Sequence, residues 1–271
     1  MHRLALTSLF LFTTASPALA TWSVIAVDGR TGEVVISSAT CVPQERFASF
    51  PAKGLMDVQA IIVPGKGVAA AQAGVDRTRA NQKLIYAEID RGTDPTEIIT
   101  QLKADPQIET RQFGIVDMHG RMAGFSGQKN NAASLDRQDR VPGTDIYFSI
   151  QGNILMSDEV VAAAIDAFKA ASGTLADRTM VAMETADAKG GDKRCTCESD
   201  PKVDAACNGK TAHVAYIVSA GKADAPGTSF NDGKYAMFID VANTEIKPNE
   251  NANPVKTLRM RYDAWKKEHG R

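Results

Sequence analysis

The order of the predicted strands and helices constrains the fold of this 271-residue chain more than any other feature. Alternating apolar residues and Gly-containing turns predict strands, and apolar positions three and four residues apart predict helices. The resulting order is four strands, two helices, three strands, two helices, two strands and one helix. A doubly wound parallel sheet needs single helices between consecutive strands, whereas here the helices come in pairs. The order therefore predicts an α+β fold of two largely antiparallel sheets packed face to face, each covered by a helix pair.

The residue pattern places these elements along the chain. Strands are expected at 22–27, 33–38, 59–63, 68–73, 112–117, 121–125, 146–150, 212–219 and 235–241. Helices are expected at 77–91, from 94 onward, at 158–171, at 175–188 and at about 253–269. Asp94 is a good N-cap, Pro95 suits the first helical position, and Glu97 completes a capping box. The polar stretch before the strand at 146–150 is expected to be a loop.

Residues 1–20 have the anatomy of a secretory signal peptide. A short polar start precedes an apolar run at 4–13, and Ala18-Leu19-Ala20 places small residues at the two positions that signal peptidase reads. The run is shorter than the roughly 20 apolar residues that span a bilayer, and anchoring through it is the alternative interpretation. We expect an exported protein, periplasmic or secreted, that has no membrane contact after cleavage and forms one domain over residues 21–271.

The composition and the motif search exclude several classes of function. The chain has 31 Lys and Arg residues against 32 Asp and Glu residues, so the basic surface that nucleic-acid binding needs is not expected. It lacks a phosphate-binding P-loop and the HExxH and GxSxG motifs. The four histidines are scattered, which leaves poor material for a Ser-His-Asp triad. We expect no cofactor and no metal.

The four cysteines are Cys41, Cys195, Cys197 and Cys207. In an exported chain an even number of cysteines favours disulfides, and three pairings are possible. A metal site is the alternative, but Cys195 and Cys197 are separated by one residue where zinc knuckles have two to four, and no pair of histidines accompanies them. The sequence thus predicts disulfides and does not choose among the pairings.

Cleavage after Ala20 would change the chemistry of Thr21. A free N-terminal threonine has its own base, because the α-amino group has a reference pKa of about 7.7–8.0 and is partly neutral near neutral pH. The amine can accept the proton of the hydroxyl directly or through a water, which activates the hydroxyl as a nucleophile without a histidine. The alternative is that Thr21 begins the mature chain by chance.

Five sequence blocks in series resemble the DUF1028 family. They are "TWSVIAVDGRTGEVVISSATCV" at 21–42, "GKGVAAAQAG" at 65–74, "RQFGIVDMHGRMAGFSG" at 111–127, "SIQGNIL" at 149–155 and "AKGGDKR" at 188–194. The resemblance implies a member of the N-terminal nucleophile (Ntn) hydrolase superfamily, with a four-layer αββα sandwich. That superfamily places its nucleophile at the first residue of the first strand, and the matching position here is Thr21. The resemblance implies no particular substrate.

In such a fold, strand ends near Thr21 would supply the rest of the site. Ser37, Ser38 and Thr40 end the second strand and could orient the amine, or they could be a polar strand end facing water. Gly74 could offer a backbone N–H to an oxyanion, or it could be a turn glycine. Asp192 could hold the ammonium or the hydroxyl, or it could pair with its neighbours Lys193 and Arg194. The candidate substrate-binding residues, all amides close to glycines, are Gln72, Gln151 and Asn153.

These observations predict an exported Ntn-type hydrolase that cuts an amide-like bond through an acyl-enzyme, with Thr21 as nucleophile and its own amine as base. The partner would be a small-molecule or peptide substrate. The alternative is a non-catalytic exported module that keeps this fold and binds a ligand or partner, and a third class is a disulfide-stabilised structural protein.

Overall fold

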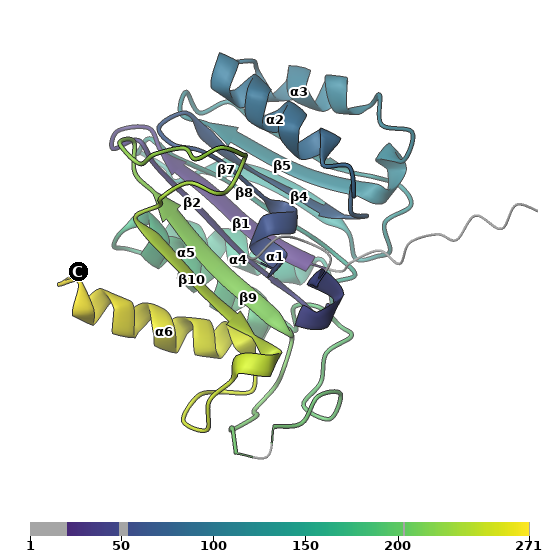
Figure 1. Cartoon of the computed structure of the whole chain (residues 1–271), viewed down its shortest axis with the longest axis vertical. Helices are drawn as coiled ribbons and strands as arrows, with labels where there is room; N and C mark the ends of the chain where they lie inside the picture. Colours follow the sequence, from purple (N-terminus) through teal and green to yellow (C-terminus); the bar gives the residue numbers. More distant parts are fainter. Residues whose placement is uncertain (1–20, 49–53, 203, 271) are drawn as a thin grey trace, which may run out of the picture.

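The helices and strands of this protein form four layers, with two sheets inside and helices on both outer faces (Figure 1). The structure is a computed structural model, and it describes residues 21–48, 54–202 and 204–270. The predicted signal peptide at 1–20 lies outside these residues. The strands are β1 (Thr21–Asp28), β2 (Glu33–Thr40), β3 (Ala60–Val63), β4 (Gly67–Ala73), β5 (Arg111–Asp117), β6 (Met122–Ser126), β7 (Leu135–Arg140), β8 (Ile146–Asn153), β9 (Val214–Ala220) and β10 (Met237–Ala242). The helices are α1 (Gly54–Gln59), α2 (Ala80–Arg91), α3 (Pro95–Leu102), α4 (Glu159–Ala170), α5 (Leu175–Ala188) and α6 (Pro254–Glu268).

Two antiparallel sheets form the inner layers. The six-stranded sheet has the order β10-β9-β2-β1-β8-β7, and the four-stranded sheet has the order β3-β4-β5-β6. Helices α2 and α3 cover the outer face of the four-stranded sheet, and α4, α5 and α6 cover the outer face of the six-stranded sheet (Figure 1). A third apolar cluster fills the space between the sheets. The predicted α+β arrangement of two antiparallel sheets covered by helices is confirmed, with α6 as a third helix beside the pair α4 and α5.

The central position of β1 follows from its composition, because both of its faces are buried. Ile25 and Val27 pack between the sheets, and Trp22 and Val24 pack toward the helices. Successive side chains of a strand point to opposite faces, so Thr21 faces the inter-sheet layer together with Ile25 and Val27. A strand that is buried on both faces has a nearly continuous apolar sequence, and this pattern made β1 easy to predict.

Two elements are missing from the sequence-based prediction. Strand β7 has the sequence LDRQDR, lies at the edge of the six-stranded sheet and pairs with β8. The prediction of a loop here was wrong because charged residues on an edge strand hide the apolar alternation, although charge is common on such edges. Helix α1 is only six residues long, too short for helical periodicity to be visible.

The helix boundaries test the predicted capping residues and first helical residues. Asp94 caps α3 by accepting a hydrogen bond from the Thr96 N–H, and Pro95 is the first helical residue, as predicted. A reciprocal capping box forms at α5, between Thr174 and Asp177. Helix α2 begins three residues later than predicted.

The four cysteines form two disulfides. Cys41 at the end of β2 pairs with Cys195 across 154 residues, and Cys197 pairs with Cys207 across 10 residues. The prediction of disulfides is confirmed, and one of the three pairings is now selected. Among the described residues, no helix is both long and apolar enough to cross a membrane.

Candidate active site

Three polar side chains lie in a row across adjacent strands at one end of the six-stranded sheet. Thr21 of β1 is directly opposite Thr40 of β2 and Asn153 of β8. The Thr21 hydroxyl donates to the Thr40 hydroxyl at 3.3 Å, and the Thr21 N–H donates to Asn153 Oδ1 at 2.9 Å. All three are buried, with exposed fractions of 2%, 0% and 0%. In the 271-residue chain the Thr21 nitrogen belongs to a peptide bond, so only cleavage after residue 20 would make it an amine.

Gln72 of β4 connects this row to the opposite sheet. Its Nε2 donates to the Thr21 carbonyl at 3.1 Å and to Gln112 Oε1 at 2.8 Å. Its Oε1 accepts from the Ser23 hydroxyl at 2.7 Å and from Gln59 Nε2 at 2.6 Å. Gln72 therefore uses both donors and both acceptor positions of its amide, and it fixes the backbone of Thr21 from the far side of the inter-sheet layer.

The same network extends along β8. Gln151 Nε2 donates to the Ser23 hydroxyl, and Gln151 Oε1 accepts from the Ser149 hydroxyl at 2.7 Å. On the other side, Gln112 donates to the Gly152 carbonyl at 2.9 Å. Buried polar groups are tolerated when they are hydrogen-bonded, and a fully paired network of this kind is rigid. Of the three predicted substrate-binding amides, Gln72 and Gln151 thus use both the oxygen and the nitrogen of the amide to bind protein groups.

Ser37 and Gly74 are not placed to act as the sequence suggested. Ser37 is opposite Val24, so it lies on the helix-covered face of the sheet, away from the Thr21 side chain, and its hydroxyl donates to the Tyr216 carbonyl at 2.7 Å. The Gly74 N–H already donates to the Thr110 carbonyl at 2.7 Å. A Cβ at Gly74 would lie 2.7 Å from Thr110 Oγ1, so this glycine is explained by a close backbone approach.

Asp192 is completely buried and supports the end of β2. One carboxylate oxygen accepts the Cys41 N–H at 3.0 Å, and the carboxylate forms an ion pair with Arg194 at 2.8 Å. Lys193 instead donates to the Ala132 carbonyl. The pairing of Asp192 with Arg194 is the alternative that the sequence left open, and it holds the chain next to Thr40.

Two residues at strand ends near this row have positive φ although they are not glycines. They are Ala73, with φ 68°, and Ile154, with φ 54°. For a β-branched residue such as Ile154 this conformation is a genuine outlier, and strained residues of this kind cluster at functional sites. Ile154 directly follows Asn153, so the strain lies next to the row.

Several residues of the network were missed by sequence reasoning. They are Ser23, Gln59 and Gln112. A signal was present, because glutamines recur inside the small-residue or apolar strands "GVAAAQAG", "RQFG" and "SIQGN". A glutamine flanked by residues that a sheet buries must find partners there, and three such strands predict partners for one another.

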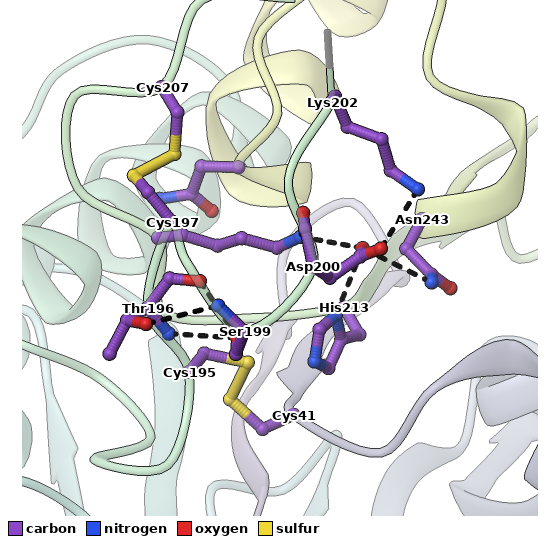
Figure 2. Close-up of polar contacts among 12 residues, drawn as sticks. Cys41, Cys195, Thr196, Cys197, Ser199, Asp200, Lys202, Cys207, His213 and Asn243 are labelled. Carbon is purple, nitrogen blue, oxygen red and sulfur yellow. Dashed lines mark hydrogen bonds and ion pairs between the residues drawn. A yellow bond between two sulfur atoms is a disulfide. The ribbon is translucent and has the colours of Figure 1, made fainter.

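A disulfide-bonded loop adjoins the same end of the sheet (Figure 2). The His213 N–H donates to the Thr40 carbonyl at 2.7 Å, which ties the end of the loop to β2. Asp200 forms the centre of the loop and binds Lys210 at 2.7 Å and Lys202 at 3.0 Å. Burial opposes ionisation of Asp200, but the hydrogen bonds from Lys210 and Lys202 outweigh it and lower its pKa to about 2. For His213, burial disfavours the charged imidazolium and lowers the pKa, and the charge of Lys210 lowers it further.

Replacing Asp200 with asparagine is expected to change how stability depends on pH. A carboxylate with a depressed pKa stabilises the fold above its unfolded pKa of about 3.8, and this contribution is lost as the pH falls toward 2. Asp200→Asn should therefore lower the free energy of unfolding by about 2 kcal/mol at pH 7, and the difference from wild type should shrink toward pH 2. Urea unfolding at both pH values measures this.

The matched control for this prediction is Asp263→Asn. Asp263 pairs with Arg259 on the surface of α6, with its side chain 59% exposed, and exposed pairs contribute little. A difference between Asp200→Asn and wild type that does not change with pH would contradict the prediction.

Two cavities lie away from the row of Thr21, Thr40 and Asn153, because none of these three residues lines them. A groove of about 660 Å³ runs beside the end of β4 and is lined by Val75, Asp76 and Arg111, among others. A cavity of about 320 Å³ lies near Glu33 and Lys266, at the opposite end of β2 from Thr40. Within 21–48, 54–202 and 204–270, no group of three His, Cys, Asp or Glu side chains is arranged to hold a metal ion.

Comparison with known proteins gives a family and a fold. Residues 21–200 match the family described as "Family of unknown function (DUF1028)". The crystal structure of protein SPO2555 from Silicibacter pomeroyi, which is assigned to DUF1028, is similar with a TM-score of 0.64 and 17% sequence identity. The similarity covers 91% of this chain and 89% of that one. The comparison with curated proteins found no match.

Proposed function

The chain belongs to the DUF1028 family, and from that premise we propose that it is an exported hydrolase of amide-like bonds with N-terminal Thr21 as its nucleophile. The observation that carries the proposal is the place of Thr21. It is the first residue of a central strand, and its hydroxyl and its nitrogen are each held by a side chain of an adjacent strand. We propose that the two-sheet sandwich is of the Ntn-hydrolase type, in which this position is the nucleophile.

The proposed reaction uses groups that Thr21 itself provides. The neutral amine takes the proton from Oγ1 as this oxygen attacks the carbonyl carbon of the substrate. The protonated amine then gives a proton to the departing amine, and an ester remains on Oγ1. Water attacks this ester with the same amine as base, which releases the acid and restores Thr21. Asn153 Oδ1 accepts an N–H of Thr21 and so directs the lone pair of the amine away from Asn153.

Export is part of the proposal because the amine exists only after cleavage. The two disulfides support an oxidising compartment, since such bonds are rare in the reducing cytosol. The junction Ala18-Leu19-Ala20 before Thr21 supports cleavage at the required bond.

The secreted protein is expected to begin at Thr21. Intact mass and N-terminal sequencing of the protein recovered outside the cytoplasm measure this. Replacing Ala18 and Ala20 with bulky residues should block cleavage and leave the leader attached, whereas the same change at the exposed Ala162 would leave processing unaffected. A mature chain that begins at any other residue would refute Thr21 as the nucleophile.

A further inference from the structure

We propose that the side-chain nitrogen of Asn153 holds the oxyanion that forms on the substrate carbonyl when Thr21 attacks. This inference rests on the proposed function and assigns a second catalytic group to the same site. In the tetrahedral intermediate the carbonyl oxygen gains a full negative charge, and a preorganised N–H donor stabilises that charge more than it stabilises the neutral carbonyl of the substrate.

Asn153 has a buried donor that is not used by the fold. Its side chain is completely buried, and its Oδ1 accepts the Thr21 N–H, but its Nδ2 has no hydrogen-bond partner among the described residues. Leaving a buried donor unpaired destabilises a fold, so such a group calls for an explanation. An oxyanion that forms only during the reaction would explain why this donor has no partner in the fold.

The position of this donor relative to Thr21 is fixed. Thr21 and Asn153 are opposite each other in the β1–β8 pair and face the same inter-sheet layer. The 2.9 Å bond from the Thr21 N–H to Oδ1 orients the amide plane, so Nδ2 is held beside the same residue as the attacking oxygen.

The backbone around Asn153 is held on both sides. The Gly152 carbonyl accepts from Gln112 across the sheets. The strained Ile154 gives its N–H to the Asn131 carbonyl and accepts from the Lys193 N–H. These hydrogen bonds hold Ile154, directly beside the proposed donor, in a backbone conformation that an unconstrained chain would rarely adopt.

The other amide donors that were candidates for this site are already paired. Both N–H groups of Gln72 are used, by the Thr21 carbonyl and by Gln112. Gln151 Nε2 donates to Ser23, and the Gly74 N–H donates to Thr110. Of the amide donors that the sequence placed at this site, the structure leaves that of Asn153 available.

The test uses mature protein and p-nitrophenyl acetate. Attack by Thr21 Oγ1 forms an acetyl ester and releases p-nitrophenol, and hydroxylamine removes an ester but not an acetylated amine. The rate of hydroxylamine-labile acetylation, located at Thr21 by peptide mass spectrometry, is measured from pH 6 to pH 10. Asn153→Asp keeps the acceptor oxygen and the size of the side chain and removes the N–H donor. Its rate at the high-pH plateau should fall about 10²- to 10³-fold.

The pH profile distinguishes two roles of Asn153: donating a hydrogen bond to the oxyanion, or only holding the Thr21 amine in place. A carboxylate beside the amine raises the amine pKa and shifts the profile to higher pH, but it leaves the plateau unchanged if Nδ2 has no role. A plateau equal to that of wild type would overturn the inference. Asn153→Ala lacks the donor and adds no charge, so its plateau should fall as well.

Asn231→Asp is the matched control. Asn231 is also buried, and its Nδ2 donates to the carbonyls of Met56, Asp57 and Ala60. This variant should be less stable and keep the wild-type rate at the high-pH plateau, whereas Asn153→Asp should have a lower rate at that plateau. If wild type acquires no labile acetyl group at Thr21, the proposed function itself fails, which is a different result from failure of Asn153 alone.

Discussion

Mature protein with Thr21→Ala is expected to acquire no hydroxylamine-labile acetyl group from p-nitrophenyl acetate. The variant keeps an N-terminal amine but lacks Oγ1, the oxygen that attacks the substrate in the proposed mechanism. Removing a nucleophile costs several orders of magnitude in rate, so we expect a fall of at least about a thousandfold, to the rate of uncatalysed reaction. Thr21→Ser keeps the hydroxyl and should retain labelling. In wild type the rate should rise with pH through about 7.7–8.0 as the amine loses its proton.

The control for Thr21→Ala is Thr179→Ala. Thr179 is equally buried, and its hydroxyl donates to the Leu175 carbonyl within α5, on the helix-covered side of the six-stranded sheet. This variant loses a buried hydroxyl in the same way and should be labelled at the wild-type rate. Equal labelling of Thr21→Ala and wild type would favour the alternative function, a non-catalytic binding module.

Removal of the Cys41–Cys195 disulfide is expected to lower the free energy of unfolding more than removal of the Cys197–Cys207 disulfide. A disulfide restricts the unfolded chain, and the effect grows with the length of the loop that it closes. For separations of 154 and 10 residues, the chain-entropy relation gives about 5 and about 3 kcal/mol. The double variant Cys41→Ala with Cys195→Ala should therefore lose about 2 kcal/mol more than Cys197→Ala with Cys207→Ala.

Guanidinium unfolding of the two double variants under the same conditions measures this difference. Both remove two cysteines and one cross-link, so each serves as the control for the other. The loss at Cys41 should also loosen the chain beside Thr40, because Asp192 and Cys195 hold the same strand end. Equal losses of stability in the two variants would show that loop length does not determine the contribution of either bond.

The layers of the fold could be predicted because burial on two faces leaves a strong pattern. Strands β1 and β4 are nearly continuous apolar or small sequence, and α4 repeats its buried residues at helical spacing. Strand β7 could not be predicted in this way, because an edge strand with charged residues has the composition of a loop. Its assignment depends on pairing with β8, which is a long-range property of the folded sheet.

The polar residues of the candidate site could be named from the sequence, but their contacts could not. The sequence indicated Thr21, Gln72, Gln151 and Asn153, and the structure brings all four into one hydrogen-bonded region. Which amide donors are already paired depends on the facing sheet, and no local pattern contains that information. Ser37 is a second example. The pairing register places it opposite Val24, and this register determines which face of the sheet its side chain occupies.

The glutamine network has a consequence for how the two sheets fit together. Apolar contacts restrict the relative position of two sheets less strictly than hydrogen bonds do, because one methyl group can take the place of another as a neighbour. Amides are stricter, because a shift of one residue would leave the buried Gln59, Gln72 and Gln112 without their partners. The network therefore selects one docking position of the sandwich. Loops at the rim could change in length or sequence while the first residue of β1 stays in place.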